Sequence, residues 1–198
     1  MTSYAQAFAL VSTRQANPHL QDLTDEELVA RIRQNDEQAF ACLLVRHLNS
    51  IHHYLLRLTG SRSDSDDLAQ ETFLRVWQKA HTFTPGKVRF STWLHRIAHN
   101  LTVDQFRQRG RNPVSAIDAN DKHFGPDFDR AAGELHERLS QVLTTLPENQ
   151  RHAILLCHQQ GFSNKEAAVI LGVGVRALES LLARARRTLK AELTEVLT

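Results

Sequence analysis

The sequence predicts an all-α protein made of two small helical domains joined by a flexible acidic linker. Apolar residues recur at helical spacing through most of the chain, and no segment shows the alternation expected of a strand. The composition changes between Asn112 and Gly133, where Pro, Gly, Asn and Asp dominate and the net charge is −2, a composition that packs poorly. The expected parts are a mobile arm (1–22), a first domain (23–111), the linker (112–133) and a second domain (134–198).

Composition excludes several classes of protein. The 198 residues are 41% hydrophobic and 23% charged, which is ordinary for a soluble globular protein. No apolar run approaches the roughly 20 residues of a membrane helix, and the N-terminus does not resemble a secretory signal. Cys42 and Cys157 lie in apolar helical patterns, which fits a reducing cytoplasm, although a disulfide between them remains an alternative. We therefore expect a cytoplasmic protein without direct membrane insertion.

Four helices are expected in the first domain, each framed by start and stop signals. Thr24 and Glu27 form a capping box at the start of the first helix, Gly60 is a left-handed stop, and the last of the four helices stops at Gly110. Pro85 and the glycine after it interrupt the helical pattern. The remaining three helices are expected from about 36 to 59, from about 63 to the Pro85 break, and from 91 or 92 to 110.

The segment from His81 to Arg111 combines aromatic rings with positive charge. Phe83, Phe90 and Trp93 lie among basic residues, and between Arg75 and Arg111 eight Lys or Arg oppose one acid, which gives about +7. Rings stack on exposed bases while cations follow the phosphates, so this pattern favours unpaired nucleic acid. The alternative is that the rings belong to the core and the basic groups form a solvated helix face.

The second domain is expected to end in a helix-turn-helix. One helix is expected around 135–145 and another from Pro147 to Gly161, and Ser163 with Glu166 forms a second capping box. Gly172 stands where the turn requires positive φ. The expected core of the motif is Ala167, Ala168, Leu171, Val173, Leu178, Leu181, Leu182, Ala185 and Leu189. The alternative is an amphipathic helical hairpin that happens to be basic.

The order of these segments resembles a known family. An acidic helix, DLAQETFLRVWQ, FSTWLHRIAHNLTVDQFR, the acidic linker, LPENQR and the terminal helix-turn-helix together resemble a bacterial sigma factor of the extracytoplasmic-function (ECF) group in the sigma-70 family. The resemblance implies that the first domain corresponds to sigma region 2, which binds the polymerase clamp and the promoter's minus-ten element. It implies that the second corresponds to region 4, which reads the minus-35 element.

The resemblance also assigns candidate residues. Positions that match the polymerase-binding surface are Asp67, Gln70, Glu71 and Arg75, although a solvated helix face is the alternative for each. Positions that match the capture of unpaired minus-ten bases are Lys87, Arg89, Phe90, Trp93, Arg96, Asn100, Arg107 and Arg109. Positions available to minus-35 duplex are Lys165, Arg176, Glu179, Ser180, Arg184 and Arg187.

The recognition helix departs from the family pattern at one place. Glu179 and Leu181 stand near its middle, where members of the family usually carry basic residues. An acid accepts a hydrogen bond from cytosine but repels nearby phosphate, so the detail of minus-35 recognition stays open. Arg176 at the start of the helix is a candidate to compensate, because that end points at base edges in such motifs.

The resemblance implies partners and no catalysis. The expected partners are core RNA polymerase, through the clamp helices of its β′ subunit and the flap of β, promoter DNA and an anti-sigma factor. No enzymatic activity, cofactor or metal is expected. Neither the inducing signal nor the identity of the anti-sigma factor follows from the residues.

Two other functions remain as alternatives. His95 and His99 at i, i+4 have a spacing that can bind zinc, so a metal-dependent enzyme is one, although no HExxH motif occurs. The other is a regulator that binds duplex DNA through its helix-turn-helix alone, as LuxR-type regulators do. Such a regulator would not need the basic aromatic segment of the first domain.

Overall fold

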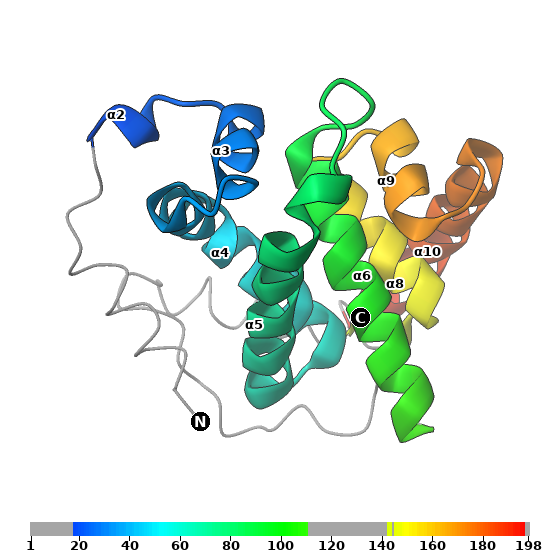
Figure 1. Ribbon diagram of the computed structural model, residues 1–198. Coiled ribbons are helices and arrows are strands. Elements are labelled where there is room, and N and C mark those ends of the chain that lie inside the picture. Colours follow the sequence, from blue (N-terminus) through cyan, green and yellow to red (C-terminus); the bar gives the residue numbers. More distant parts are fainter. Residues whose placement is uncertain (1–17, 111–141, 144, 197–198) are drawn as a thin grey trace.

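The structure is a computed structural model that describes residues 18–110, 142–143 and 145–196. Every regular element in these ranges is helical, which confirms the all-α prediction (Figure 1). Among the described helices, none is both long and apolar enough to cross a membrane. In chain order the elements are α2 (Pro18–Gln21), α3 (Asp25–Ile32), α4 (Glu37–Thr59), α5 (Arg62–Lys79), the 3-10 turn η1 (Ala80–Thr82), α6 (Phe90–Arg109), α8 (Glu148–Ile154), the π-helical turn η2 (Leu155–Gln159), α9 (Asn164–Leu171) and α10 (Val175–Val196).

Local sequence signals set the helix ends. The Thr24 hydroxyl accepts a hydrogen bond from the Glu27 N–H, and the Glu27 carboxylate accepts one from the Thr24 N–H, so the predicted capping box is confirmed. Asp36 caps α4 by accepting from two backbone N–H groups of its first turn. Gly60 and Gly110 end α4 and α6 with φ of 64° and 58°, a conformation that glycine adopts without a Cβ clash.

The N-terminal boundary differs from the prediction. Residues 18–21 belong to the predicted mobile arm, but they form α2 and pack against α4. Leu20 is buried there, and its carbonyl accepts a 3.4 Å hydrogen bond from the Cys42 thiol. The arm prediction is therefore wrong for residues 18–21, because burial of one leucine holds this turn on the core. Residues 1–17 of the arm, the linker at 112–133 and most of the helix predicted at 135–145 lie outside the described residues.

The first lobe comprises α2 to α6. Figure 1 shows α5 and α6 lying side by side; α4 packs against both of them, and α3 packs on α4. Along α4, Leu43, Ile51, Leu55 and Leu58 recur at helical spacing and face this core. The first lobe thus contains all the elements that carry the predicted minus-ten and polymerase surfaces.

The second lobe comprises residues 142–143 and 145–196, with α8 and the helix-turn-helix of α9 and α10. The helix predicted to run from Pro147 to Gly161 widens at its end into the π turn η2, in which the Gln160 N–H donates to the Leu155 carbonyl at 2.9 Å. Gly161 then reverses the chain with φ of 70°, and Phe162 turns its ring inward. This reversal brings α9 back against α6.

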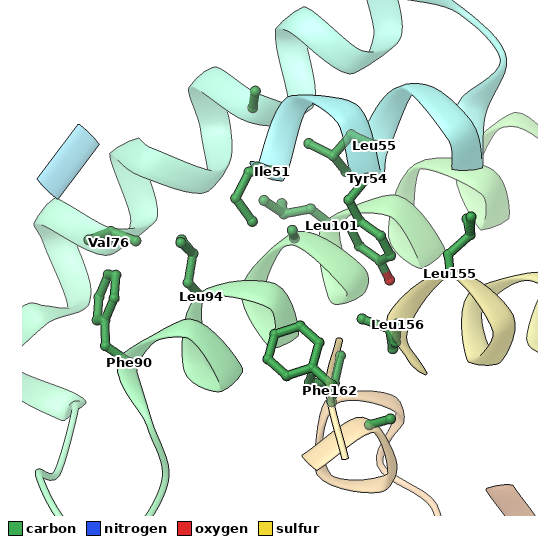
Figure 2. Close-up of a cluster of buried hydrophobic side chains, with 14 of the residues drawn as sticks. Ile51, Tyr54, Leu55, Val76, Phe90, Leu94, Leu101, Leu155, Leu156 and Phe162 are labelled. Atoms are coloured by element: carbon green, nitrogen blue, oxygen red, sulfur yellow. The ribbon is translucent and has the colours of Figure 1, made fainter. Parts of the chain in front are cut away.

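The two lobes share one hydrophobic core. Figure 2 shows Tyr54 of α4 and Leu101 of α6 among side chains of the second lobe, namely Leu155, Leu156 and Phe162. Polar groups also cross between the lobes: the Ser50 hydroxyl donates to the Gln160 side-chain carbonyl at 2.7 Å. The sequence predicted two helical domains but did not predict that they pack together. We call this contact the seam.

Candidate nucleic-acid interface

A short loop between η1 and α6 presents the first basic groups. Pro85 and Gly86 form the turn of this loop, and Gly86 has a φ of 84°. The helix α6 then begins at Phe90, with Arg89 as its N-cap. Lys87 and Arg89 are exposed, as the sequence predicted. Both therefore lie at the positive end of the α6 dipole, which adds to their attraction for phosphate.

The aromatic rings of this segment are part of the core. Phe83 and Phe90 are each 1% exposed, and their rings meet edge to face with centroids 5.8 Å apart. Trp93 is partly exposed and packs against both rings. The structure thus contradicts the prediction that the Phe90 ring is available to an unpaired base. The physical reason is the helix start: it places Phe90 one turn before Leu94, on the face that packs into the first lobe (Figure 2).

The polar face of α6 carries the remaining minus-ten candidates. Arg96, Asn100 and Arg107 are exposed and recur at spacings of four and seven residues, which places them on one side of the helix. Arg107 makes an exposed ion pair of 3.5 Å with Asp104, which is a weak contact. Arg109 is the last residue of α6, and its side chain lies outside the described set.

Arg33 positions the loop, and sequence reasoning missed it. Its guanidinium donates to the Ala80 carbonyl at 3.1 Å and also to the Phe83 carbonyl. These two bonds fix the chain where it leaves η1. No local motif marks Arg33, because its acceptors lie 47 and 50 residues further along the chain.

The helix-turn-helix is formed as predicted. Ser163 and Glu166 make a reciprocal capping box at the start of α9, and Gly172 ends it with φ of 66°. The six minus-35 candidates are all exposed, and those from α10 lie opposite the buried Leu178, Leu182 and Ala185 face. They are Lys165, Arg176, Glu179, Ser180, Arg184 and Arg187.

One residue of the predicted core of this motif lies outside it. Val173 is 38% exposed. It follows Gly172 in the turn, where its N–H donates to the Ala168 carbonyl and its side chain lies on the outer side. Leu171, Leu181 and Leu189 are partly buried against the core rather than fully enclosed. The exposed residues of α10 include four arginines, Arg176, Arg184, Arg186 and Arg187, and Glu179, so this side remains net positive, which suits an approach to DNA phosphates.

The outer face of α5 carries the polymerase-binding candidates. Asp67 and Gln70 are exposed, and Glu71 and Arg75 are half-buried and joined by a 2.8 Å ion pair at i, i+4. Leu74 lies between them in the sequence and is 49% exposed. A single exposed leucine is common on protein surfaces, so Leu74 is a candidate contact only together with the polar candidates of the same helix. Sequence reasoning missed Leu74, although it stands off the buried stripe of α5 and could have been found by that test.

The alternative metal site is not supported by the geometry. His95 and His99 point into the seam, and the described residues contain no group of three or more His, Cys, Asp or Glu side chains able to hold a metal ion. Cys42 and Cys157 are both free thiols, so they form no disulfide with each other. Burial raises the pKa of the Cys157 thiol, which keeps it protonated and unreactive near neutral pH.

An ion pair joins the two candidate DNA surfaces across the seam. The Arg89 Nε lies 2.5 Å from Oε1 of Glu166, the residue that also completes the α9 capping box. Partial burial raises the pKa of Glu166, but hydrogen bonds from Arg89 and Ser163 outweigh burial and hold this pKa below its ordinary value. The loop between η1 and α6, which carries Lys87 and Arg89 and is here called the minus-ten loop, therefore touches the helix-turn-helix in this arrangement.

Family models match both lobes in the predicted order. The model described as Sigma-70 region 2 matches residues 43–112, and the one described as Sigma-70, region 4 matches residues 136–189. Two solved structures are similar. CnrH in complex with the cytosolic domain of CnrY shares 30% identity over 86% of this chain and 97% of that one, with a TM-score of 0.67. The sigma factor RpoE in complex with the anti-sigma factor NepR from Bartonella quintana shares 27% identity over 76% and 94%, with a TM-score of 0.65.

Curated proteins give the same result. The ECF RNA polymerase sigma factor SigE of Mycolicibacterium smegmatis is 33% identical over 160 residues, which cover 75% of this chain and 59% of that protein. The ECF RNA polymerase sigma-E factor of Haemophilus influenzae is 31% identical over 182 residues, or 86% of this chain and 95% of that protein. The Escherichia coli (strain K12) protein of the same name is 32% identical over 181 residues, with 85% and 94% covered. This chain therefore belongs to the ECF RNA polymerase sigma factors.

Proposed function

We propose that this sigma factor binds core RNA polymerase in the cytoplasm and directs it to promoters, without catalysing a reaction itself. The observation that carries the proposal is the pairing of two exposed basic surfaces on one helical chain: the loop and polar face of α6, and the outer face of α10. The first is placed to hold an unpaired strand and the second to enter a major groove.

Burial of Phe90 changes how the minus-ten strand would be held. With Phe83 and Phe90 enclosed, Trp93 is the ring of the three that retains exposed surface. Stacking on one ring returns about 1–3 kcal/mol, while extruding a base costs a few kcal/mol. One ring therefore does not open a duplex alone. We assign base selection to hydrogen bonding by Asn100, and strand binding to the cations at Lys87, Arg89, Arg96 and Arg107.

The polymerase supplies the rest of the energy and docks on α5. Asp67, Gln70, Glu71 and Arg75 lie on the same helix as the exposed Leu74, which adds an apolar contact to these polar side chains. The partner surface is the clamp helices of the β′ subunit, and the second lobe meets the flap of β. An anti-sigma factor is a further partner, because the similar CnrH and RpoE structures were each solved with another protein bound.

Transcription from purified components tests the proposal. Core polymerase with this protein should give promoter-specific transcripts from promoters of the source organism, whereas core polymerase alone should not. Absence of any specific transcript would refute the sigma function. Footprinting without polymerase distinguishes a sigma factor from a stand-alone helix-turn-helix regulator, because the regulator protects its site by itself and the sigma factor does not. Purification from the native cell should recover the polymerase subunits and the inhibitor with this chain.

A further inference from the structure

Three histidines meet at the seam, and neither DNA binding nor polymerase binding uses them. His95 and His99 extend from α6, and His152 extends from α8 to meet them beside Tyr54 of α4. Their exposed fractions are 2%, 7% and 0%, and Tyr54 is 0% exposed. The rings pack closely, with centroids of His99 and His152 4.6 Å apart. A cluster of imidazoles thus lies where the lobes join (Figure 2 shows Tyr54 among the apolar side chains there).

The hydrogen bond between the lobes requires at least one neutral ring. Nδ1 of His99 lies 2.7 Å from Nδ1 of His152, so one nitrogen donates and the other accepts. The Tyr54 hydroxyl lies 3.3 Å from the same His152 nitrogen. A neutral His152 Nδ1 has one lone pair, which can accept the His99 N–H at the shorter contact, while the Tyr54 hydroxyl approaches the same nitrogen. One added proton still leaves a donor and an acceptor between the rings, but when both His99 and His152 are protonated two N–H donors face each other and the bond is lost.

The surroundings offer little compensation for an added positive charge. Arg151 of α8 is buried next to His152 and is already cationic, and His47 of α4 faces His95. Glu148 of α8 lies 3.9 Å from Nε2 of His152, too far for a hydrogen bond, and burial raises the pKa of this carboxyl.

On the other side of the cluster, a protonated His95 would also carry a poorly compensated positive charge. Its Nδ1 bonds the Ser91 carbonyl at 2.8 Å, and its ring meets Phe162 of the second lobe edge to face with centroids 4.7 Å apart. Phe162 covers the ring with apolar surface, and the neutral Gln160 side chain of the second lobe, which raises the pKa of His95 by a hydrogen bond, is outweighed by burial. A charged His95 would therefore lose water when the lobes close and gain no anion in return.

We propose that this histidine cluster is a proton-sensitive latch: neutral imidazoles hold the two lobes together, and protonation separates them. Protonation places uncompensated charge in the buried lobe contact, and protonation of both His99 and His152 also removes the hydrogen bond between them, while separation returns all three rings to water.

The direction of the pH dependence and the pH range over which the lobes separate follow from the shifted pKa values of the three histidines. Burial lowers the pKa of His95 and of His99 to about 4, and lowers the pKa of His152 well below its ordinary value. Histidines in contact with water titrate near 6.5, so the closed arrangement is fully stable above about pH 6.5 and loses stability as the pH falls toward about 4. At about pH 5.5 a histidine that opening exposes to water is about ten times more often protonated than neutral. The ratio of closed to open molecules therefore falls about tenfold for each such histidine.

Opening is measured on the full chain without polymerase or DNA. Gln78 of α5 and Ala191 of α10 are exposed positions on different lobes, and cysteines there, with Cys42 and Cys157 replaced by alanine, carry a fluorophore pair. Single-molecule energy transfer should show one short distance at about pH 8 and a growing long-distance population below about pH 6.5. Circular dichroism at each pH should show unchanged helix content.

The variants identify the groups responsible. His99→Phe keeps a ring in the seam but cannot take a proton, so its loss of the closed form at about pH 5.5 should be about tenfold smaller than that of the wild type. His158→Gln is the matched control: this histidine is exposed on η2 next to the seam, and its variant should open like the wild type.

Three results would overturn the latch. One is a wild-type distance that does not change between about pH 8 and pH 5. Another is separation that occurs only together with loss of helix, which is acid unfolding. The third is a His99→Phe protein that is helical and opens like the wild type. The wild-type measurement decides the question even if His99→Phe does not fold. An effect of the latch on transcription rests on the proposed function, but lobe opening does not, so failure of one leaves the other intact.

Discussion

Asn100 and Arg96 lie one turn apart on the polar face of α6, and their chemistry predicts different effects on promoter binding. An amide pairs with a base edge and discriminates between bases by about 1–3 kcal/mol, whereas a guanidinium on phosphate does not distinguish sequence. Arg96→Ala should weaken open complexes at all promoters alike and lower their salt dependence. Asn100→Ala should change the relative use of promoters that differ in the minus-ten element. Transcription from a promoter panel measures both, and equal effects of both variants on every promoter would contradict the role of Asn100.

Arg151 shows what a buried cation contributes to stability. Its guanidinium is 2% exposed and donates to the carbonyls of Leu143, Leu146 and Leu58 at 2.9, 3.1 and 3.3 Å. Arg151→Ala leaves buried acceptors unpaired, so the free energy of unfolding should fall by about 3 kcal/mol or more. Arg151→Lys should recover only part of this loss, because an ammonium lacks the planar fork.

Urea unfolding measures this difference. The matched control is Arg184→Ala on the exposed face of α10, which should change the free energy of unfolding by less than about 0.5 kcal/mol. An Arg151→Ala protein that unfolds at the wild-type urea concentration would show that the three carbonyls find other donors.

Among the elements, helix ends are where local chemistry is most visible. The Ser163 hydroxyl caps α9 by accepting from the Glu166 N–H, and the Glu166 carboxylate accepts a 3.0 Å hydrogen bond from the Ser163 N–H. Ser163→Ala should lower the free energy of unfolding by about 1 kcal/mol. Ser180→Ala, an exposed change inside α10, should leave it within about 0.5 kcal/mol of the wild type in the same urea titration. Equal effects of the two variants would mean that the cap does not stabilise α9.

Features set by local interactions were predictable from the sequence. Both capping boxes, the Gly60, Gly110 and Gly172 stops and the helix-turn-helix each depend on residues within a few positions of one another, and each is confirmed. The same holds for exposure of the minus-35 candidates, since the apolar stripe of α10 fixes which side faces outward.

Features set by contacts distant in the chain were not predictable. The Phe90 ring could stack on a base or pack in the core, and only the position of α6 against α4 and α5 decides between these. Arg33 bonds carbonyls about 50 residues away, and the histidine cluster joins rings 53 residues apart. Helical spacing carries no information about such pairings. Leu20 was missed for the same reason, because its partner is Cys42 on α4.

At the scale of the whole molecule, the seam and the proposed function require different arrangements. Elements centred at minus ten and minus 35 are about 25 base pairs apart, on the order of 80 Å along duplex DNA. The Arg89–Glu166 ion pair instead holds the minus-ten loop against the helix-turn-helix. The two surfaces cannot reach both elements at once while this contact persists. The proposed function therefore requires that the lobes separate when the polymerase engages a promoter.

Locking the seam tests this requirement. Ser50 and Gln160 face each other across it, so Ser50→Cys with Gln160→Cys, in a chain without the native cysteines, should be joined by a short bismaleimide. The joined protein should keep its helix content and lose promoter-specific transcription with core polymerase, because its lobes cannot span the two elements. The same double variant left unjoined, and each single variant treated with the reagent, should remain active. If the joined protein transcribed as well as the unjoined one, promoter recognition would proceed without separation, and one lobe alone would have to select the promoter.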